Sequence, residues 1–211
     1  MITASQKEAI KKGELLPIME YFYSIQGEGF YAGRPAFFIR LAGCDVGCVW
    51  CDVKESWDSE AHEVLSADYL VNKVRESGAN FCVITGGEPA MYDLAELTIS
   101  LKDLGMYIAV ETSGAYPLKG VFDWVCLSPK KFKKPEKSVI EVAKELKVIV
   151  FNTHDFKWGE EYANQVSNDC KLYLQPEWEK HEEMCIYILD YIKENPTWNI
   201  SLQTHKFLGV Q

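Results

Sequence analysis

Runs of apolar residues with the length of a β-strand recur along the whole chain. Several are apolar at consecutive positions, as at 81–84 and 148–151. Such runs are typical of strands covered on both faces, as in a parallel sheet. The predicted strands lie at residues 17–23, 35–42, 81–85, 106–111, 123–128, 146–151, 171–175 and 198–203.

Helical patterns separate these strands. Ser66 suits the N-cap of a helix that ends near Gly78, and leucines repeat at helical spacing over 94–104. A third helix is predicted over about 180–195, where Pro196 ends it. Strands that alternate with helices predict an α/β fold with right-handed crossovers.

The length of the chain limits the architecture. No repeat or flexible linker divides residues 1–211, so we predict a single domain. A complete eight-fold barrel typically needs about 250 residues. We therefore expect a partial, trimmed TIM-like barrel with a mostly parallel sheet. Its functional residues should gather at the carboxyl ends of the strands.

Composition and charge exclude several classes of protein. The fraction of hydrophobic residues, 47%, is that of a globular protein, and the net charge of −9 argues against a nucleic-acid binder held by phosphate contacts. No apolar run reaches the roughly 18 residues of a membrane helix. The N-terminal segment lacks the apolar core of a signal peptide, so we expect a cytoplasmic protein without a membrane partner.

Three of the seven cysteines form a C-x3-C-x2-C cluster, Cys44, Cys48 and Cys51, directly after a predicted strand. A reduced compartment favours metal or redox chemistry over disulfides for clustered cysteines. A structural zinc site would need four ligands, and no fourth cysteine or paired histidine lies nearby. An iron–sulfur cluster with one iron left open for a small molecule explains three thiolates better.

This spacing, with the aromatic Trp50 beside the last cysteine, resembles the radical S-adenosylmethionine (SAM) superfamily. The segment TGGEP at 85–89 follows the next predicted strand, where two glycines let a backbone approach a ligand. In that superfamily a Gly-Gly-Glu-Pro segment binds the methionine part of SAM. The resemblance implies a 4Fe-4S cluster and SAM as cofactors.

Further segments narrow the resemblance to one family. IQGEG at 25–29, ETSG at 111–114, SPK at 128–130, QPE at 175–177 and LQTHK at 202–206 follow or end predicted strands. Together they are similar to the 7-carboxy-7-deazaguanine synthases of the queuosine (7-deazapurine) pathway, which are lyases. The resemblance implies conversion of 6-carboxy-5,6,7,8-tetrahydropterin to 7-carboxy-7-deazaguanine with loss of ammonia.

The resemblance also implies roles for individual residues. Cluster ligands would be Cys44, Cys48 and Cys51. SAM would be bound by Trp50, Gly87, Glu88, Ser113, Ser128, Lys130 and Gln175. The pterin would be held by Gln26, Gly27, Glu28, Arg40, Thr85, His205 and the C-terminal Gln211. The chemistry suits this substrate, because a carboxylate such as Glu28 accepts from an N–H/NH₂ edge and the fork of Arg40 matches a carboxylate. A strand-end salt bridge is the alternative for Arg40, and a surface position is the alternative for His205.

One position departs from the family. Its members commonly have Thr or Ser after the Cys-Asp pair, and that hydroxyl ligates Mg²⁺, whereas this chain has Val53. Valine offers no side-chain oxygen, so Asp52 is the remaining candidate ligand for Mg²⁺. We expect a weaker Mg²⁺ requirement than in hydroxyl-bearing relatives.

Two other functions use parts of the same pattern. A glycyl-radical-enzyme activase would use the same cluster but would need a surface for a large protein partner. A zinc-stabilised binding module would need the missing fourth ligand. The pterin enzyme is favoured over both by the IQGEG and LQTHK segments. Its expected partners are a reducing flavodoxin or ferredoxin and, by resemblance, a second copy in a homodimer.

Overall fold

One curved nine-stranded sheet runs through the protein, in the order β3-β1-β2-β4-β5-β6-β7-β8-β9. The computed structural model describes residues 2–211. The strands are β1 (Leu15–Ile25), β2 (Pro35–Leu41), β3 (Glu63–Ser66), β4 (Phe81–Gly86), β5 (Tyr107–Thr112), β6 (Trp124–Leu127), β7 (Glu145–Val150), β8 (Lys171–Pro176) and β9 (Trp198–Ile200). From β2 to β9 every neighbouring pair is parallel, while β1 is antiparallel to β2 and β3. The predicted mostly parallel α/β sheet is confirmed.

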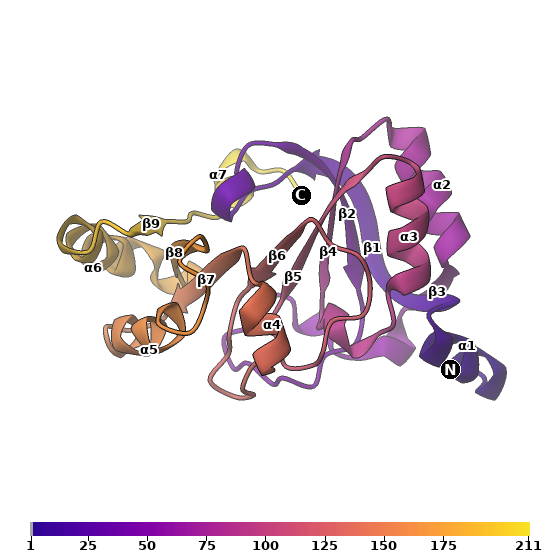
Figure 1. Ribbon diagram of the computed structural model, residues 1–211, viewed down its shortest axis with the longest axis horizontal. Helices are drawn as coiled ribbons and strands as arrows, with labels where there is room; N and C mark the ends of the chain where they lie inside the picture. Colours follow the sequence, from indigo (N-terminus) through magenta and orange to yellow (C-terminus); the bar gives the residue numbers. More distant parts are fainter. Residues whose placement is uncertain (1) are drawn as a thin grey trace.

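Helices cover the outer face of this sheet (Figure 1). These are α2 (Ala67–Ser77), α3 (Ala95–Asp103), α4 (Lys137–Val142), α5 (His154–Ala163) and α6 (His181–Glu194). The helix α1 (Ala4–Lys12) buries no residue, and α7 (Thr204–Leu208) contributes residues to the cavity instead. Ser66 caps α2 by accepting from the Tyr69 amide, as its position in the sequence predicts. Two apolar cores fill the space between helices and sheet, one under α2 and α3 and the other under α5 and α6.

The pleat of the strands places core residues on one face of the sheet and cavity-lining residues on the other. On β2, Phe37, Ile39 and Leu41 pack into the outer core, whereas Phe38 lies in an inner aromatic cluster and Arg40 lines the cavity. Successive side chains of a strand point to opposite faces, so the concave face receives every second residue. The inner cluster closes one end of the half-barrel, and polar residues occupy the other end.

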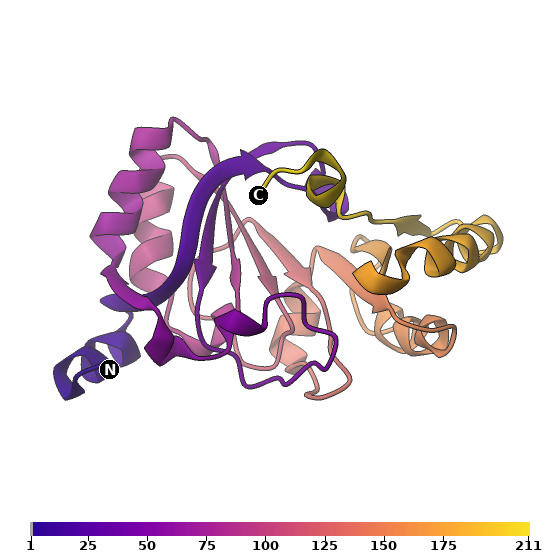
Figure 2. The same cartoon turned by 180° about the vertical axis from the view of Figure 1, so that it is seen from behind.

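The structure adds elements that the sequence pattern does not reveal. α1, β3, α4, α5 and α7 were not predicted, and β9 ends at Ile200 rather than at residue 203. At that point the Ser201 amide donates to Leu174 O at 2.8 Å and the chain leaves the sheet. Figure 2 shows the consequence: the C-terminal segment, in yellow, lies beside the arch formed by β1.

No helix among residues 2–211 has the length and apolar character needed to cross a bilayer.

Candidate active site

A cavity of about 370 Å³ lies at the carboxyl ends of the strands. Every residue that the sequence analysis assigned to a site lines it, although those residues come from segments spread between positions 26 and 211. Arg40 and Thr85 are neighbours in the β2–β4 register, and Ser128, Lys130 and Gln175 follow from strands further along the sheet. Parallel strands bring their carboxyl ends to one edge, which explains why strand-end motifs meet there.

The cysteine loop forms one wall of this cavity. Cys44, Cys48 and Cys51 all line it and all are free thiols. The loop is fixed at Asp45, which accepts hydrogen bonds from Tyr116 and, at 2.9 Å, from Lys133. Burial raises the pKa of the Cys48 thiol to about 11.

The residues of this wall fit an iron–sulfur cluster. Among residues 2–211 no three His, Cys, Asp or Glu side chains converge closely enough to hold a single metal ion. A four-iron cluster does not need such convergence, because each thiolate binds a different iron atom. Three free thiols on one loop, facing a cavity, are therefore the appropriate donor set for a cluster rather than for zinc.

The TGGEP segment packs tightly against this loop. The Gly87 amide donates to Leu41 O and the Glu88 amide donates to Gly43 O, both at 2.9 Å. A side chain on Gly87 would collide with Gly43 O and contact the Cys44 side chain. The glycines are thus required because two backbone segments meet at this point.

The carboxylate of Glu88 is already fully occupied. It is 1% exposed and accepts hydrogen bonds from the Thr112 and Ser113 hydroxyls and from the Ser113 and Ala90 amides. Its side chain therefore connects β4 to the end of β5 and orients Ser113. The predicted contact between Glu88 and SAM stays a prediction.

The SAM-side residues beyond β5 also have partners within the protein. Lys130 donates to the Ser128 hydroxyl at 2.6 Å, and burial lowers the pKa of its ammonium. Gln175 accepts from Ser201 at 2.7 Å, and the Ser201 hydroxyl in turn accepts from the Gly29 amide at 2.9 Å. This chain of hydrogen bonds joins β8 to the IQGEG segment.

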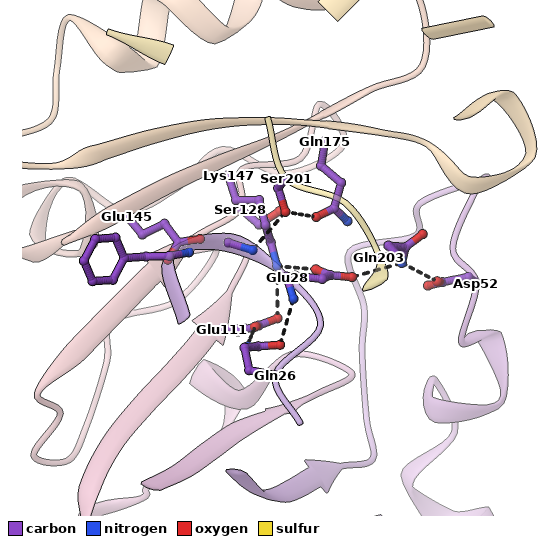
Figure 3. Close-up of polar contacts among 12 residues, drawn as sticks. Gln26, Glu28, Asp52, Glu111, Ser128, Glu145, Lys147, Gln175, Ser201 and Gln203 are labelled. Carbon is purple, nitrogen blue, oxygen red and sulfur yellow. Dashed lines mark hydrogen bonds and ion pairs between the residues drawn. The ribbon is translucent and has the colours of Figure 1, made fainter. Parts of the chain in front are cut away.

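A buried charged network also lines the cavity (Figure 3). Lys147 on β7 forms ion pairs with Glu28 and, at 3.3 Å, with Glu111. Gln203 donates to Glu28 at 3.0 Å and Gln26 donates to Glu111 at 2.7 Å. Burial opposes ionisation of Glu28, but the Lys147 ammonium outweighs it and lowers the pKa of Glu28 to about 2.

Arg40 forms the salt bridge that the sequence analysis held as its alternative role, and it also lines the cavity. Its Nε lies 2.8 Å from Glu20 Oε1, across the β1–β2 pair. Among residues 2–211, Arg40 Nε and Glu177 Oε2 are the buried side-chain polar atoms without a well-aligned hydrogen bond. Both residues lie in the cavity wall, where a bound ligand or water can supply the missing partners.

His205 and Gln211 reach the cavity from the C-terminal segment. The Thr204 amide donates to Gly27 O at 3.0 Å, and a side chain on Gly27 would collide with the His205 ring. Burial lowers the pKa of His205, which favours the neutral imidazole. The Gln211 main-chain oxygen accepts from the Ser24 hydroxyl, so the end of the chain is tied to β1.

Asp52 does not form a magnesium site as it stands. Its Oδ2 accepts from Lys206 at 2.7 Å and lies 3.4 Å from the Gln203 amide nitrogen, while Val53 offers no side-chain oxygen. A lysine ammonium therefore satisfies the carboxylate that would ligate the ion. The described residues do not fit Mg²⁺, which demands near-octahedral oxygen ligation.

Several cavity residues escaped the sequence analysis, notably Lys147, Glu111, Gln203, Lys206 and Trp178. Glu111 lies in the ETSG segment and Gln203 and Lys206 lie in the LQTHK segment, beside residues that the sequence does predict. Lys147 was hidden inside a run interpreted as a buried strand. Its charge at an alternating position of that strand is the signal that could have revealed it.

The ionisation of Glu28 predicts a pH dependence of stability. A carboxylate whose pKa is depressed by folding stabilises the protein above its unfolded pKa, near 4.5, and this contribution is lost as pH falls toward about 2. The free energy of unfolding should therefore fall across this window, and Glu28→Gln should flatten the slope. Urea denaturation at several pH values measures both, and equal slopes in the two proteins would contradict the prediction.

Comparison with known proteins adds a family context to this geometry. The family model described as the Radical SAM superfamily matches residues 38–125. The chain is similar to a 7-carboxy-7-deazaguanine synthase of Flavobacterium psychrophilum, with 50% identity over 210 residues and full coverage of both chains. It is also similar to one from a Synechocystis species, at 50% identity over 92% of this chain and 93% of the relative. A crystal structure of QueE from Escherichia coli superposes with a TM-score of 0.81 at 32% identity, covering 96% of this chain and all of that one.

Proposed function

The chain belongs to the 7-carboxy-7-deazaguanine synthase family within the radical SAM superfamily, and from this premise we propose how its cavity serves that reaction. The enzyme contracts the ring of 6-carboxy-5,6,7,8-tetrahydropterin to 7-carboxy-7-deazaguanine with loss of ammonia. Family membership leaves no support for the activase and zinc-module alternatives.

The cysteine side of the cavity would hold the cofactors. Cys44, Cys48 and Cys51 would hold the 4Fe-4S cluster, and the backbone around Gly87, with Ser113 and Lys130, would bind SAM. When bound, the cluster and SAM together supply hydrogen-atom abstraction from a substrate carbon. The protein's own part is to fix the two ligands relative to each other and to keep other hydrogen donors away.

The opposite side of the cavity would hold the pterin. Arg40 lines the cavity, and the planar fork of its guanidinium suits the substrate carboxylate. The ionised carboxylate of Glu28 suits the N–H and NH₂ donors of the ring. The LQTHK segment, carried over the cavity by α7, places His205 beside Gly27 and would limit the access of water to the bound substrate.

The observation that carries this proposal is the shared cavity, because the three thiols, the residues predicted to bind SAM and the charged residues predicted to bind the pterin all line it. The test is an anaerobic reaction of the reconstituted enzyme with SAM, reductant and 6-carboxytetrahydropterin, followed by mass spectrometry. Formation of 7-carboxy-7-deazaguanine supports it. Formation of deoxyadenosine without a pterin product would overturn the substrate assignment. A protein that takes up no iron would overturn the cofactor assignment.

Three finer expectations remain predictions. A flavodoxin or ferredoxin would supply the electron, two chains would form a homodimer, and the enzyme would act in the cytoplasm.

The Val53 position predicts the metal dependence. Because Lys206 satisfies Asp52 and Val53 has no oxygen, adding Mg²⁺ should raise the turnover of the parent enzyme less than about 2-fold. Val53→Thr should make the turnover more sensitive to Mg²⁺, and Val53→Ala is the control of similar polarity. Turnover with and without chelator measures this. A strict Mg²⁺ requirement that Val53→Thr leaves unchanged would contradict it.

A further inference from the structure

Lys147 is a buried charge at a position where a strand normally carries an apolar residue. It is 3% exposed, and the neighbouring β7 residues Leu146 and Val148 belong to the outer core. The concave face of β7 thus presents Glu145, Lys147 and Ile149. Removing a charge from water costs free energy unless the charge is paired. The residues that pair with Lys147 therefore indicate its role.

Both partners of Lys147 are carboxylates that line the cavity. The ammonium bridges Glu28 of the IQGEG segment and Glu111 at the end of β5. Figure 3 shows the three side chains meeting in the centre of the network, with Gln26 and Gln203 attached at its two ends. Each glutamate therefore receives one amide donor and one ammonium donor, and each carboxylate keeps acceptor capacity for a ligand.

Lys147 places one ammonium between the two carboxylates. Two neighbouring carboxylates in a buried site repel each other, and the pKa of one of them normally rises. Here burial would lower the pKa of Lys147, but Glu111 and Glu28 hold it well above its usual value. The other titratable groups that face this cluster are Glu145, Cys126, Lys130, His205 and Asp52.

We propose that Lys147 is a positioning residue of the substrate pocket, and that Glu111 joins Glu28 in a paired carboxylate acceptor for the 2-amino-4-oxo pyrimidine ring of the pterin. This inference rests on the proposed function and names the groups that select the substrate. From the sequence, Glu28 is the one carboxylate predicted to accept from the N–H/NH₂ edge of the ring.

The chemistry of the ring fits two acceptors better than one. The reduced pterin presents N–H donors at N3 and N8 and an amino group at C2, while a single carboxylate accepts from two of them. A 2-oxo analogue would place a carbonyl oxygen where the pterin has its amino group. Two ionised carboxylates would repel that oxygen and leave buried acceptors unpaired, which is a strong basis for rejection.

The first test removes the Lys147 ammonium that bridges Glu28 and Glu111. Lys147→Met keeps the length of the side chain and removes its charge, and Lys144→Met, at an exposed lysine before the same strand, is the matched control. Binding of the unreactive analogue 6-carboxypterin to reconstituted holoenzyme with SAM is followed by fluorescence. We expect the Kd of Lys147→Met to rise about 10- to 100-fold. We also expect its affinity to increase with pH beyond any change in the parent, because Glu28 loses the ammonium that lowers its pKa.

The second test keeps the bridge and changes the acceptor. Glu111→Gln should lower kcat/KM for the 2-amino substrate about 10- to 100-fold and should reduce the preference for it over the 2-oxo analogue. Lys147→Arg, which preserves the charge, should retain more affinity than Lys147→Met. This variant and Glu111→Gln keep the proposal testable where Lys147→Met fails to fold.

The outcomes separate this inference from the function on which it rests. Parent enzyme that neither binds 6-carboxypterin nor converts the substrate overturns the proposed function. Active parent enzyme together with a Lys147→Met variant of unchanged Kd and unchanged pH profile overturns the role of Lys147. An unchanged 2-amino preference in Glu111→Gln overturns the paired acceptor.

Discussion

Cys48→Ala should leave the enzyme without a functional cluster and without detectable 7-carboxy-7-deazaguanine. Cys48 is 7% exposed and lies on the cavity wall between the two other cysteines of the loop. Removing one of three thiolates leaves two protein ligands for a cluster that already has one fewer than usual. Iron analysis and the visible absorption of the reconstituted protein measure the loss, and mass spectrometry measures the product.

The control for this variant is another cysteine of the same chain. Cys185→Ala lies on α6, outside the cavity, and should keep the iron content and activity of the parent. Thermal unfolding of all three proteins shows whether Cys48→Ala remains folded. Parent-level iron in a folded Cys48→Ala variant would contradict the assignment of this ligand.

Gly86→Ala should lower the free energy of unfolding by about 3 kcal/mol. Gly86 has φ +128°, a conformation that disfavours a side chain, and a Cβ there would collide with the backbone of Leu41 on the neighbouring strand. The collision is with main-chain atoms, so it cannot be relieved by turning a side chain. Because Leu41 precedes the cysteine loop, the variant should also lower iron incorporation.

Gly105→Ala separates conformational strain from the collision. Gly105 also has a positive φ, +77°, but nothing lies within 4 Å of the position of a Cβ. Gly105→Ala should lower the free energy of unfolding by about 1 kcal/mol from backbone strain alone. Urea denaturation measures both variants, and equal losses would show that the contact between Gly86 and Leu41 is unimportant.

The charged network explains why the pterin side of the cavity can be polar without unfolding the barrel. Lys147, Glu28 and Glu111 line the cavity, and each charge has a partner from another segment. On the other side of the network, the Ser201 hydroxyl accepts from the Gly29 amide of the IQGEG segment and the Glu145 carboxylate accepts from the adjacent Phe30 amide. The carboxylates that we propose as pterin acceptors are therefore held by the fold before any substrate arrives, which would lower the ordering cost of binding.

Local structural features can be predicted from the sequence because each depends on few neighbouring residues. Helix boundaries at Ser66 and Gly78 follow from capping, which involves residues within one turn. Strand positions follow from apolar runs. The short strand β3 and the short helix α7 are not predicted, because their patterns cover too few residues to stand out. Arg40 shows the limit, because its partner Glu20 lies on an adjacent strand whose register no local pattern specifies.

The cysteine loop, the glycine turn beside it and the strand-end motifs can be identified from their spacing along the chain, because that spacing sets which of these groups can act together. Which charges meet depends on the folded chain. Lys147 is separated from Glu28 by 119 positions and from Glu111 by 36, and Asp52 is separated from Lys206 by 154. Such pairs depend on strand order, on the curvature of the sheet and on the return of the C-terminal segment over the cavity, which arise from packing the whole chain at once.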